Sequence, residues 1–204
     1  MEIRTRAVGP WPMNTYVLVC PVTRQSVLVD PGAEPETLSA LLQDTIPTAI
    51  LLTHTHRDHI GALDVMRQQL GVPLQAHRGP HANGVQLDAE RWLADGDTVT
   101  IGLCGLRACA TPGHSADMLS FVLVDDHRVL VGDTVFDSGP GRTWSVEGFQ
   151  TTLVTLRQIV LAWPDTTICY PGHGPSFCLG DRRAAIEAFV DRDHGAFFGD
   201  ATWS

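Results

Sequence analysis

The sequence contains no lysine, because all 14 of its basic residues are arginines. Without a lysine the chain has no ε-amino group for a Schiff base or a nucleophile, and it lacks the Lys of a Walker-type phosphate loop. A basic excess is absent too, since 23 acidic residues give a formal net charge of −9. Nucleic-acid binding needs a basic face that neutralises phosphates, so we expect no nucleic-acid partner.

Long hydrophobic runs and paired cysteine motifs are also missing. No apolar segment reaches the roughly 18 residues that span a membrane. Arg4 and Arg6 precede any long apolar run, which argues against a signal peptide. The five cysteines are odd in number and are never spaced C-x-x-C, which favours buried free thiols over disulfides. We therefore expect a cytoplasmic protein with no membrane partner.

The 204 residues, 44% of them hydrophobic, show no linker, charge block or repeat, so we expect one domain over residues 1–204. Apolar segments bounded by turn residues predict strands; these are residues 3–7, 15–20, 26–30, 49–52, 72–76, 98–101, 106–110, 119–124, 128–131 and 166–170. Apolar residues at helical spacing predict helices; these are residues 35–43, the segment after residue 59 to about 70, residues 146–161 and residues 182–192. The stretch 77–96 stays ambiguous. Two halves of strands and helices predict packed sheets with helices outside.

An unusual histidine motif follows the apolar segment AILLT. His54, His56, Asp58 and His59 form H-x-H-x-D-H at the start of a predicted helix. Imidazole nitrogens and carboxylate oxygens suit Zn²⁺ and similar divalent metals. A helix start needs one capping carboxylate and gains nothing from three histidines around it. The motif therefore indicates a metal site.

Three further metal-competent side chains follow apolar strands at short glycine-containing turns. They are His114 in ATPGH, Asp133 in VLVGD and His173 in YPGH. Loops that meet at strand ends commonly build sites on a rigid scaffold. Five histidines and two aspartates exceed the ligands of one tetrahedral zinc and suit two metals that share a carboxylate. The other histidines are expected to be exposed; they are His77, His81, His127 and His194.

These motifs resemble those of the metallo-β-lactamase superfamily. The similarity covers nearly the whole chain: H-x-H-x-D-H at 54–59, TPGH ending at His114, GDTVF around Asp133 and PGHG around His173. It implies an α/β fold, a four-layer αβ/βα sandwich of two mixed β-sheets with helices on the outer faces. It implies a first metal held by His54, His56 and His114. It also implies a second metal held by Asp58, His59 and His173, with Asp133 bridging the two.

Within the superfamily the chain is most similar to glyoxalase II (hydroxyacylglutathione hydrolase) and its small bacterial relatives. The segments that carry this similarity are GDTVFDSGPGRTW and PGHGPSFCLGDRR. It implies a hydrolase in which two divalent cations, Zn²⁺ first and Fe or Mn as alternatives, activate a water as hydroxide. Asp58 would orient that water or accept its proton. The expected substrate is a small-molecule thioester, because a thiolate leaves without being protonated.

Several points stay open at the level of sequence. Arg142 either binds a substrate carboxylate through a bidentate fork or ties down its own loop. The GRT segment also resembles persulfide dioxygenases of the same fold, so a mononuclear iron dioxygenase is an alternative, as is a lactonase. Asp133 stands where the best-known β-lactamases use a cysteine, which disfavours an antibiotic-degrading enzyme. The acyl group, the thiol carrier, recognition of glutathione and the oligomeric state do not follow from the sequence.

Overall fold

The computed structural model describes residues 1–204 and arranges its strands in two six-stranded sheets. The first sheet has the order β1-β2-β3-β4-β5-β6, with β1 (Glu2–Val8), β2 (Met13–Val19), β3 (Gln25–Val29), β4 (Ile46–Leu51), β5 (Leu74–His77) and β6 (Arg91–Leu93). The second has the order β12-β11-β10-β9-β8-β7, with β7 (Thr98–Ile101), β8 (Cys104–Ala110), β9 (Leu119–Leu123), β10 (Arg128–Gly132), β11 (Ile168–Pro171) and β12 (Phe177–Cys178). Both sheets mix parallel and antiparallel pairs.

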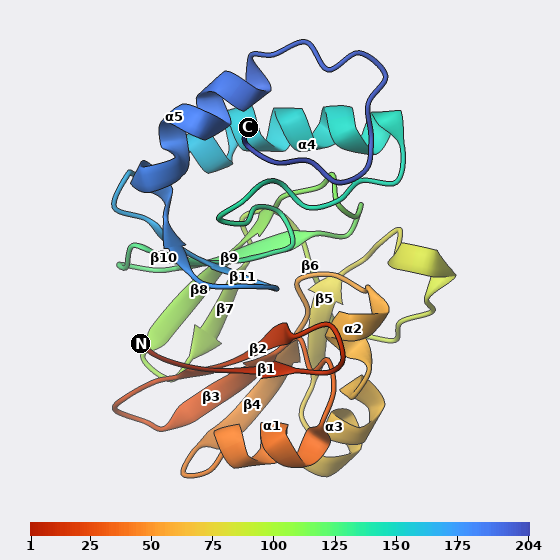
Figure 1. Ribbon diagram of the computed structural model, residues 1–204. Helices are drawn as coiled ribbons and strands as arrows, with labels where there is room; N and C mark the ends of the chain where they lie inside the picture. The colour runs from red at the N-terminus through yellow and green to blue at the C-terminus, as the bar shows by residue number, and fades with distance from the viewer.

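Helices cover the two outer faces of this sandwich (Figure 1). The first sheet carries α1 (Pro35–Leu41), α2 (Arg57–Ile60) and α3 (Leu63–Leu70). The second carries α4 (Val146–Gln158) and α5 (Leu179–Val190), and two 3₁₀ turns, η1 (Ala82–Gly84) and η2 (Val160–Ala162), complete the set. The four-layer αβ/βα sandwich implied by the resemblance is confirmed. None of the helices combines the length and apolarity needed to cross a bilayer.

The alternation of side chains along the strands explains how three apolar clusters form. On β2, Tyr16 and Leu18 point into the space between the sheets, whereas Val17 and Val19 pack beneath the helices of the first sheet. A third cluster joins the second sheet to α4 and α5. Each sheet is therefore buried on both faces, which explains why its strands have such apolar sequences.

Several local features differ from the sequence-based expectations, among them the helix predicted over residues 146–161, which ends at Gln158 and is followed by η2. β6 lies in the ambiguous stretch and β12 was not expected. The helix predicted to reach residue 70 is interrupted between α2 and α3, where Gly61 lies against the Gly32 carbonyl, and a Cβ there would come within 2.4 Å of that oxygen. α5 begins at Leu179, ahead of the predicted start at residue 182. All five cysteines are free, but only Cys20 and Cys169 are buried.

The hairpin of the first sheet reaches across to the second sheet. The Asn14 backbone N–H donates to Gly172 O at 2.6 Å, and its side-chain Nδ2 donates to Pro171 O at 3.0 Å. The Tyr16 hydroxyl donates to the same Pro171 carbonyl at 2.6 Å. These bonds fix the end of β11 and the turn after it against the first half of β2.

Candidate metal centre

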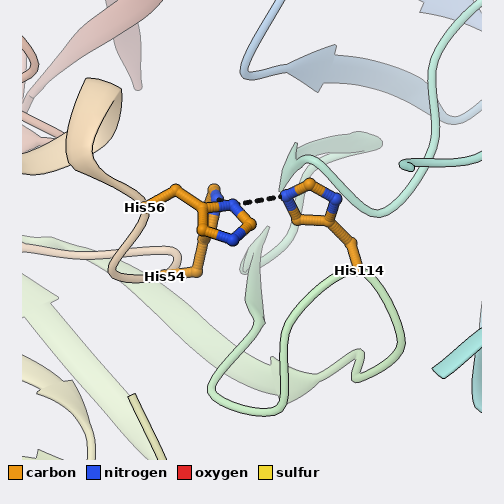
Figure 2. A group of neighbouring side chains, drawn as sticks. All are labelled: His54, His56 and His114. Atoms are coloured by element: carbon orange, nitrogen blue, oxygen red, sulfur yellow. Dashed lines mark hydrogen bonds between the residues drawn. The ribbon is translucent and has the colours of Figure 1, made fainter. Parts of the chain in front are cut away.

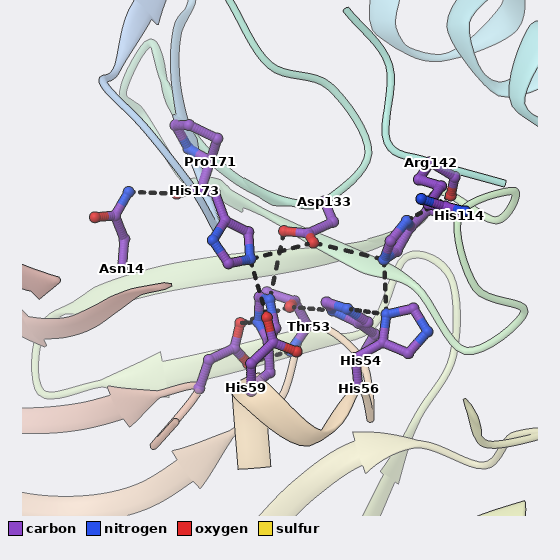
Figure 3. A network of polar contacts seen from close by, with 12 residues as sticks. Asn14, Thr53, His54, His56, His59, His114, Asp133, Arg142, Pro171 and His173 are labelled. Carbon is purple, nitrogen blue, oxygen red and sulfur yellow. Dashed lines mark hydrogen bonds and ion pairs between the residues drawn. The ribbon is translucent and has the colours of Figure 1, made fainter. Parts of the chain in front are cut away.

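The candidate ligands converge where strand ends of the two sheets meet (Figure 3). Those of the first half lie after β4 and within α2, while those of the second half follow β8, β10 and β11. Parallel pairing of β3 with β4 and of β10 with β11 brings these strand ends to the same edge of the sandwich. The structure thus brings together all seven predicted residues: His54, His56, Asp58, His59, His114, Asp133 and His173.

Three imidazoles form the first group of ligand atoms, which we call the first triad (Figure 2). His56 Nδ1 lies 3.0 Å from His54 Nε2 and 2.7 Å from His114 Nε2. His114 Nδ1 donates to the Arg142 carbonyl at 2.7 Å, which leaves the Nε2 lone pair facing the group. Burial lowers the pKa of all three imidazoles, that of His56 to about 4. They are neutral at pH 7, the form in which imidazole binds a metal.

Asp58, His59 and His173 form the second triad. His173 Nε2 lies 3.1 Å from Asp58 Oδ2. Burial alone would lower the pKa of His59, but the Asp133 and Asp30 carboxylates outweigh it and raise that pKa well above its usual value. For the Asp133 carboxyl the effects have the opposite sign. Burial raises its pKa, but the neighbouring His59 outweighs burial and holds that pKa below its usual range. The surroundings of this triad therefore favour positive charge.

Asp133 lies between the two triads. Its Oδ1 is 3.4 Å from His59 Nε2, and its Oδ2 is 3.5 Å from His114 Nε2 and 3.6 Å from His173 Nε2. His59 Nε2 and Asp133 Oδ1 are buried and have no hydrogen-bond partner. Unpartnered buried polar atoms are rare because they are costly, and a cation between them would satisfy both. The donor set and these two atoms fit a pair of divalent metals.

Asp30 belongs to the same centre and was missed by the sequence analysis. Its buried carboxylate accepts hydrogen bonds from the backbone N–H of Thr53 at 2.7 Å and from the Thr53 hydroxyl at 2.6 Å, and it lies 2.9 Å from His59 Nδ1. The contact to His59 orients that ring so that Nε2 faces Asp133. The sequence VLVDPG carries the signal used for the other candidates, a polar residue that ends an apolar strand before a turn.

A second missed carboxylate ties together the loops around the first triad. Asp117 is buried and accepts hydrogen bonds from the Thr55 hydroxyl at 2.6 Å and the Ser115 hydroxyl at 2.7 Å. The Thr55 oxygen in turn accepts from the Ala82 backbone N–H at 2.8 Å. Thr55 stands between two triad histidines and Ser115 follows the third, so Asp117 holds both loops in place. No motif in the sequence indicates this role.

The Arg142 side chain contacts two residues near it in the fold, Asp200 and Trp144. Its guanidinium pairs with Asp200 at 2.8 Å and lies over the Trp144 ring, 4.7 Å from the ring centroid. Its backbone carbonyl holds His114, as described above. Binding of a substrate carboxylate by Arg142 stays a prediction.

The expectation that the four remaining histidines are exposed is correct for His127 and wrong for the others, which are partly buried. His81 stacks on the Trp92 ring with centroids 5.8 Å apart, and His194 Nε2 lies 2.8 Å from the Phe189 carbonyl oxygen. Loop position alone did not reveal these contacts.

A cavity of about 540 Å³ opens beside the first triad, with His56 and His114 at one end. Its walls are the segments 80–83 and 112–116 and the start of α4. This is the most evident place for a substrate, because it adjoins the candidate metal ligands.

A two-sheet sandwich with clustered histidines and aspartates at its strand ends defines a metal-binding α/β protein. The chain belongs to the metallo-β-lactamase superfamily, since the family model described as "Metallo-beta-lactamase superfamily" matches residues 8–177. It is 34% identical to "Probable metallo-hydrolase YqgX" of Bacillus subtilis, with 86% of this chain and 91% of that protein covered. It is 33% identical to "Probable hydroxyacylglutathione hydrolase SPCC13B11.03c" of Schizosaccharomyces pombe, with 81% and 65% covered. The chain spans between 46% and 65% of the hydroxyacylglutathione hydrolases compared.

Solved structures show the same fold. The crystal structure of BLEG-1 B3 metallo-β-lactamase has a TM-score of 0.78 at 29% identity, covering 90% of this chain and 97% of that one. ETHE1 from Myxococcus xanthus has a TM-score of 0.76 at 27% identity, with 90% and 82% covered. TTHA1623, crystallised in a di-iron-bound form, has a TM-score of 0.75 at 30% identity, with 88% and 96% covered.

Proposed function

We propose that the protein is a hydrolase of small-molecule thioesters with a dinuclear metal centre, for which Zn²⁺ is the expected cation. The observation that carries the proposal is that His59 Nε2 of the second triad and Asp133 Oδ1, which lie 3.4 Å apart, are both buried without a hydrogen-bond partner beside two complete triads. The relatives named as hydroxyacylglutathione hydrolases support the thioester as substrate class. The five free thiols are compatible with a reducing, cytoplasmic compartment.

The chain's own residues would hold the cations and position the reacting groups. The first triad would hold one cation and the second triad the other, with Asp133 between them. When bound, such cations supply an activated water at neutral pH and polarise a carbonyl. The Asp58 side chain is 25% exposed, so it can both serve as a ligand and reach a water to orient it or accept its proton.

The alternative is a mononuclear iron persulfide dioxygenase, with a lactonase as a further possibility. A one-iron enzyme would need only part of the ligand set. The completeness of the second triad, with its unpartnered His59 Nε2, favours two cations.

Elemental analysis of the purified protein, beside turnover of a thioester, a lactone and a persulfide, tests the proposal. We expect two divalent metals per chain and fastest turnover of the thioester. One iron per chain with oxygen consumption on the persulfide would instead establish the dioxygenase. Asp58→Ala is expected to abolish thioester turnover, and unchanged turnover would overturn the role given to Asp58.

A further inference from the structure

We infer that residues 199–203 position His114 of the first triad, because they hold the peptide unit whose carbonyl orients its ring. We call these residues the clamp segment. They follow α5 in the chain and contact the loop 134–145, which leads from Asp133 to α4. This role rests on the proposed function, since it concerns a ligand of the first cation.

A single peptide unit joins the clamp segment to His114. The Arg142 carbonyl accepts from His114 Nδ1 at 2.7 Å. The Thr143 N–H belongs to the same peptide unit and donates to Gly199 O at 3.1 Å. Because a peptide unit is planar, the bond to Gly199 constrains the direction of the carbonyl on its other side. A tilt of this plane would turn the His114 ring, and with it Nε2, away from the rest of the first triad.

Further hydrogen bonds hold the clamp segment against the loop. The Gly199 N–H donates to the Thr143 hydroxyl at 3.2 Å, so these two residues are joined in both directions. The Trp203 N–H donates to Ser138 O and its indole Nε1–H donates to Asp137 O, both at 3.1 Å. Thr143 and Trp203 are buried. Breaking their bonds would leave buried polar groups without partners, which is costly.

Two other contacts near this peptide unit are weaker. The Arg142 guanidinium pairs with Asp200, but the two side chains are 50% and 75% exposed, and an ion pair in water contributes little. The Gly141 N–H donates to Thr134 O at 3.3 Å, which is long for a hydrogen bond. The buried contact with Thr143 is therefore the main restraint on the direction of the Arg142 carbonyl.

The close approach of the loop to the clamp segment depends on Gly139. A Cβ at this position would overlap the Ala201 carbonyl oxygen and lie 3.1 Å from Thr202 Cα, and its three nearest atoms all belong to the clamp segment. Gly139 is not among the glycines with positive φ, so its backbone does not require glycine. Gly139→Ala should therefore push the clamp segment away without straining the loop itself.

Competition between the protein and a chelator for Zn²⁺ tests the inference. The test variant is Gly139→Ala, and the control is Gly105→Ala, whose added Cβ would make only an ordinary contact of 3.4 Å with Val124. We expect Gly139→Ala to weaken Zn²⁺ binding roughly tenfold, the low end of the cost of changing the outer partners of a ligand. Gly105→Ala should bind Zn²⁺ as tightly as the unaltered protein.

The ring Nδ1 proton of His114 shows whether a loss of affinity acts through this ligand. Its NMR resonance is identified by its disappearance in His114→Ala, and we expect Gly139→Ala to broaden it through faster exchange with water. Thr143→Val removes only the hydroxyl that accepts from Gly199, and it replaces the first variant if Gly139→Ala does not fold. We expect it to broaden the same resonance and to weaken Zn²⁺ binding about threefold.

The outcomes separate a positioning role from a structural one. A clamp segment that only stabilises the fold would lower the free energy of unfolding in urea and leave both the Zn²⁺ affinity and the His114 resonance unchanged. That result would overturn the inference and leave the proposed function intact. Weaker Zn²⁺ binding with an unchanged His114 resonance would overturn it as well. Failure of the unaltered protein to bind Zn²⁺ would overturn the proposed function and the inference together.

Discussion

Most imidazoles of the centre are oriented by the nitrogen that faces away from the candidate metals. His114 Nδ1 contacts the Arg142 carbonyl, His173 Nδ1 contacts the Pro12 carbonyl at 3.2 Å, and His59 Nδ1 contacts the Asp30 carboxylate. Each contact leaves Nε2 pointing inward. His56 differs, because it presents Nδ1 to its neighbours. Outer partners of this kind fix ring orientation and raise ligand basicity.

Replacing His114 by alanine removes one corner of the first triad. We expect loss of the first metal and a fall in turnover of more than about 100-fold, because changes to outer partners alone typically cost 10- to 100-fold. Metal content and kcat measured on the same preparation check this. His127→Ala is the matched control, since His127 is exposed and outside the centre. Full activity of the His114 variant would discard its assignment.

Asp30→Asn tests the orientation of His59. Asp30 has a φ of 52°, a region that asparagine tolerates well, so the backbone should be kept. The amide lacks the charge and part of the acceptor capacity that the carboxylate offers to His59 and Thr53. We expect about 10- to 100-fold weaker binding of the second metal, measured by competition with a chelator. Unchanged affinity would show that other contacts suffice to hold His59.

The ligand candidates could be predicted because they either form the H-x-H-x-D-H motif after an apolar strand or follow an apolar strand singly at a turn. His54 and Asp133 are examples, and Asp30 carries the same signal although it was overlooked. Asp117 could not be predicted, because its importance comes from a hydroxyl 62 positions away along the chain. A local sequence pattern indicates local structure, but it does not indicate hydrogen bonds between residues far apart in the chain.

The turn directly after β11 is tightly constrained by its approach to the candidate metal centre. A Cβ on Gly172 would lie 2.2 Å from Asp133 Oδ1 and 2.6 Å from His59 Cε1. The turn after β11 therefore requires glycine for lack of space beside the centre. In the sequence PGH, the histidine is the candidate ligand His173, and the glycine before it is the residue that lies close to Asp133 and His59.

Gly172→Ala should consequently displace Asp133 or His59 while the sheets persist. We expect loss of the second metal and of turnover, with the circular dichroism spectrum retained. Gly105→Ala on β8 is the control, because its added Cβ would make only an ordinary contact of 3.4 Å with Val124. Two metals per chain in the Gly172 variant would contradict this account of the turn.

Asp117→Asn tests how one carboxylate couples three loops. The amide can accept from only one of the two hydroxyls with its single oxygen, so the loops that line the cavity should loosen. We expect a rise in KM larger than the fall in kcat, and a loss of stability of about 1–3 kcal/mol. Asp125→Asn, in an exposed turn, is the control. A purely structural role would lower stability and leave KM unchanged.

At the scale of secondary-structure elements, most strands and helices could be predicted from the sequence, and the exceptions have physical reasons. β6 and β12 contain three and two residues, too few for a periodic pattern to emerge. The break between α2 and α3 arises from the approach of Gly61 to Gly32, a contact between distant segments.

At the scale of the whole molecule, the centre draws its groups from both sheets. His54 and His59 belong to the first half, and His114, Asp133 and His173 to the second. Cations held by this set would link the two halves, so the stability of the fold and the occupancy of the centre should be coupled.

Removal of the metals should therefore destabilise the entire fold. A cation at 100 times its dissociation constant that binds only the folded state adds about 2.7 kcal/mol to the free energy of unfolding. We expect Tm to fall on chelation and to recover when Zn²⁺ is restored. The His54→Ala variant should show a smaller response, and a Tm independent of metal in the unaltered protein would contradict the coupling.

The bonds from Asn14 and Tyr16 to Pro171, at the end of β11, constrain when the fold can be completed during synthesis at the ribosome. The hairpin that makes them is among the first segments to emerge, yet its carbonyl partner at Pro171 lies 157 positions later than Asn14. Nearly the whole chain must therefore be synthesised before the hairpin can form these hydrogen bonds. If the second triad binds a cation, that binding would therefore come late in synthesis, after both sheets have met.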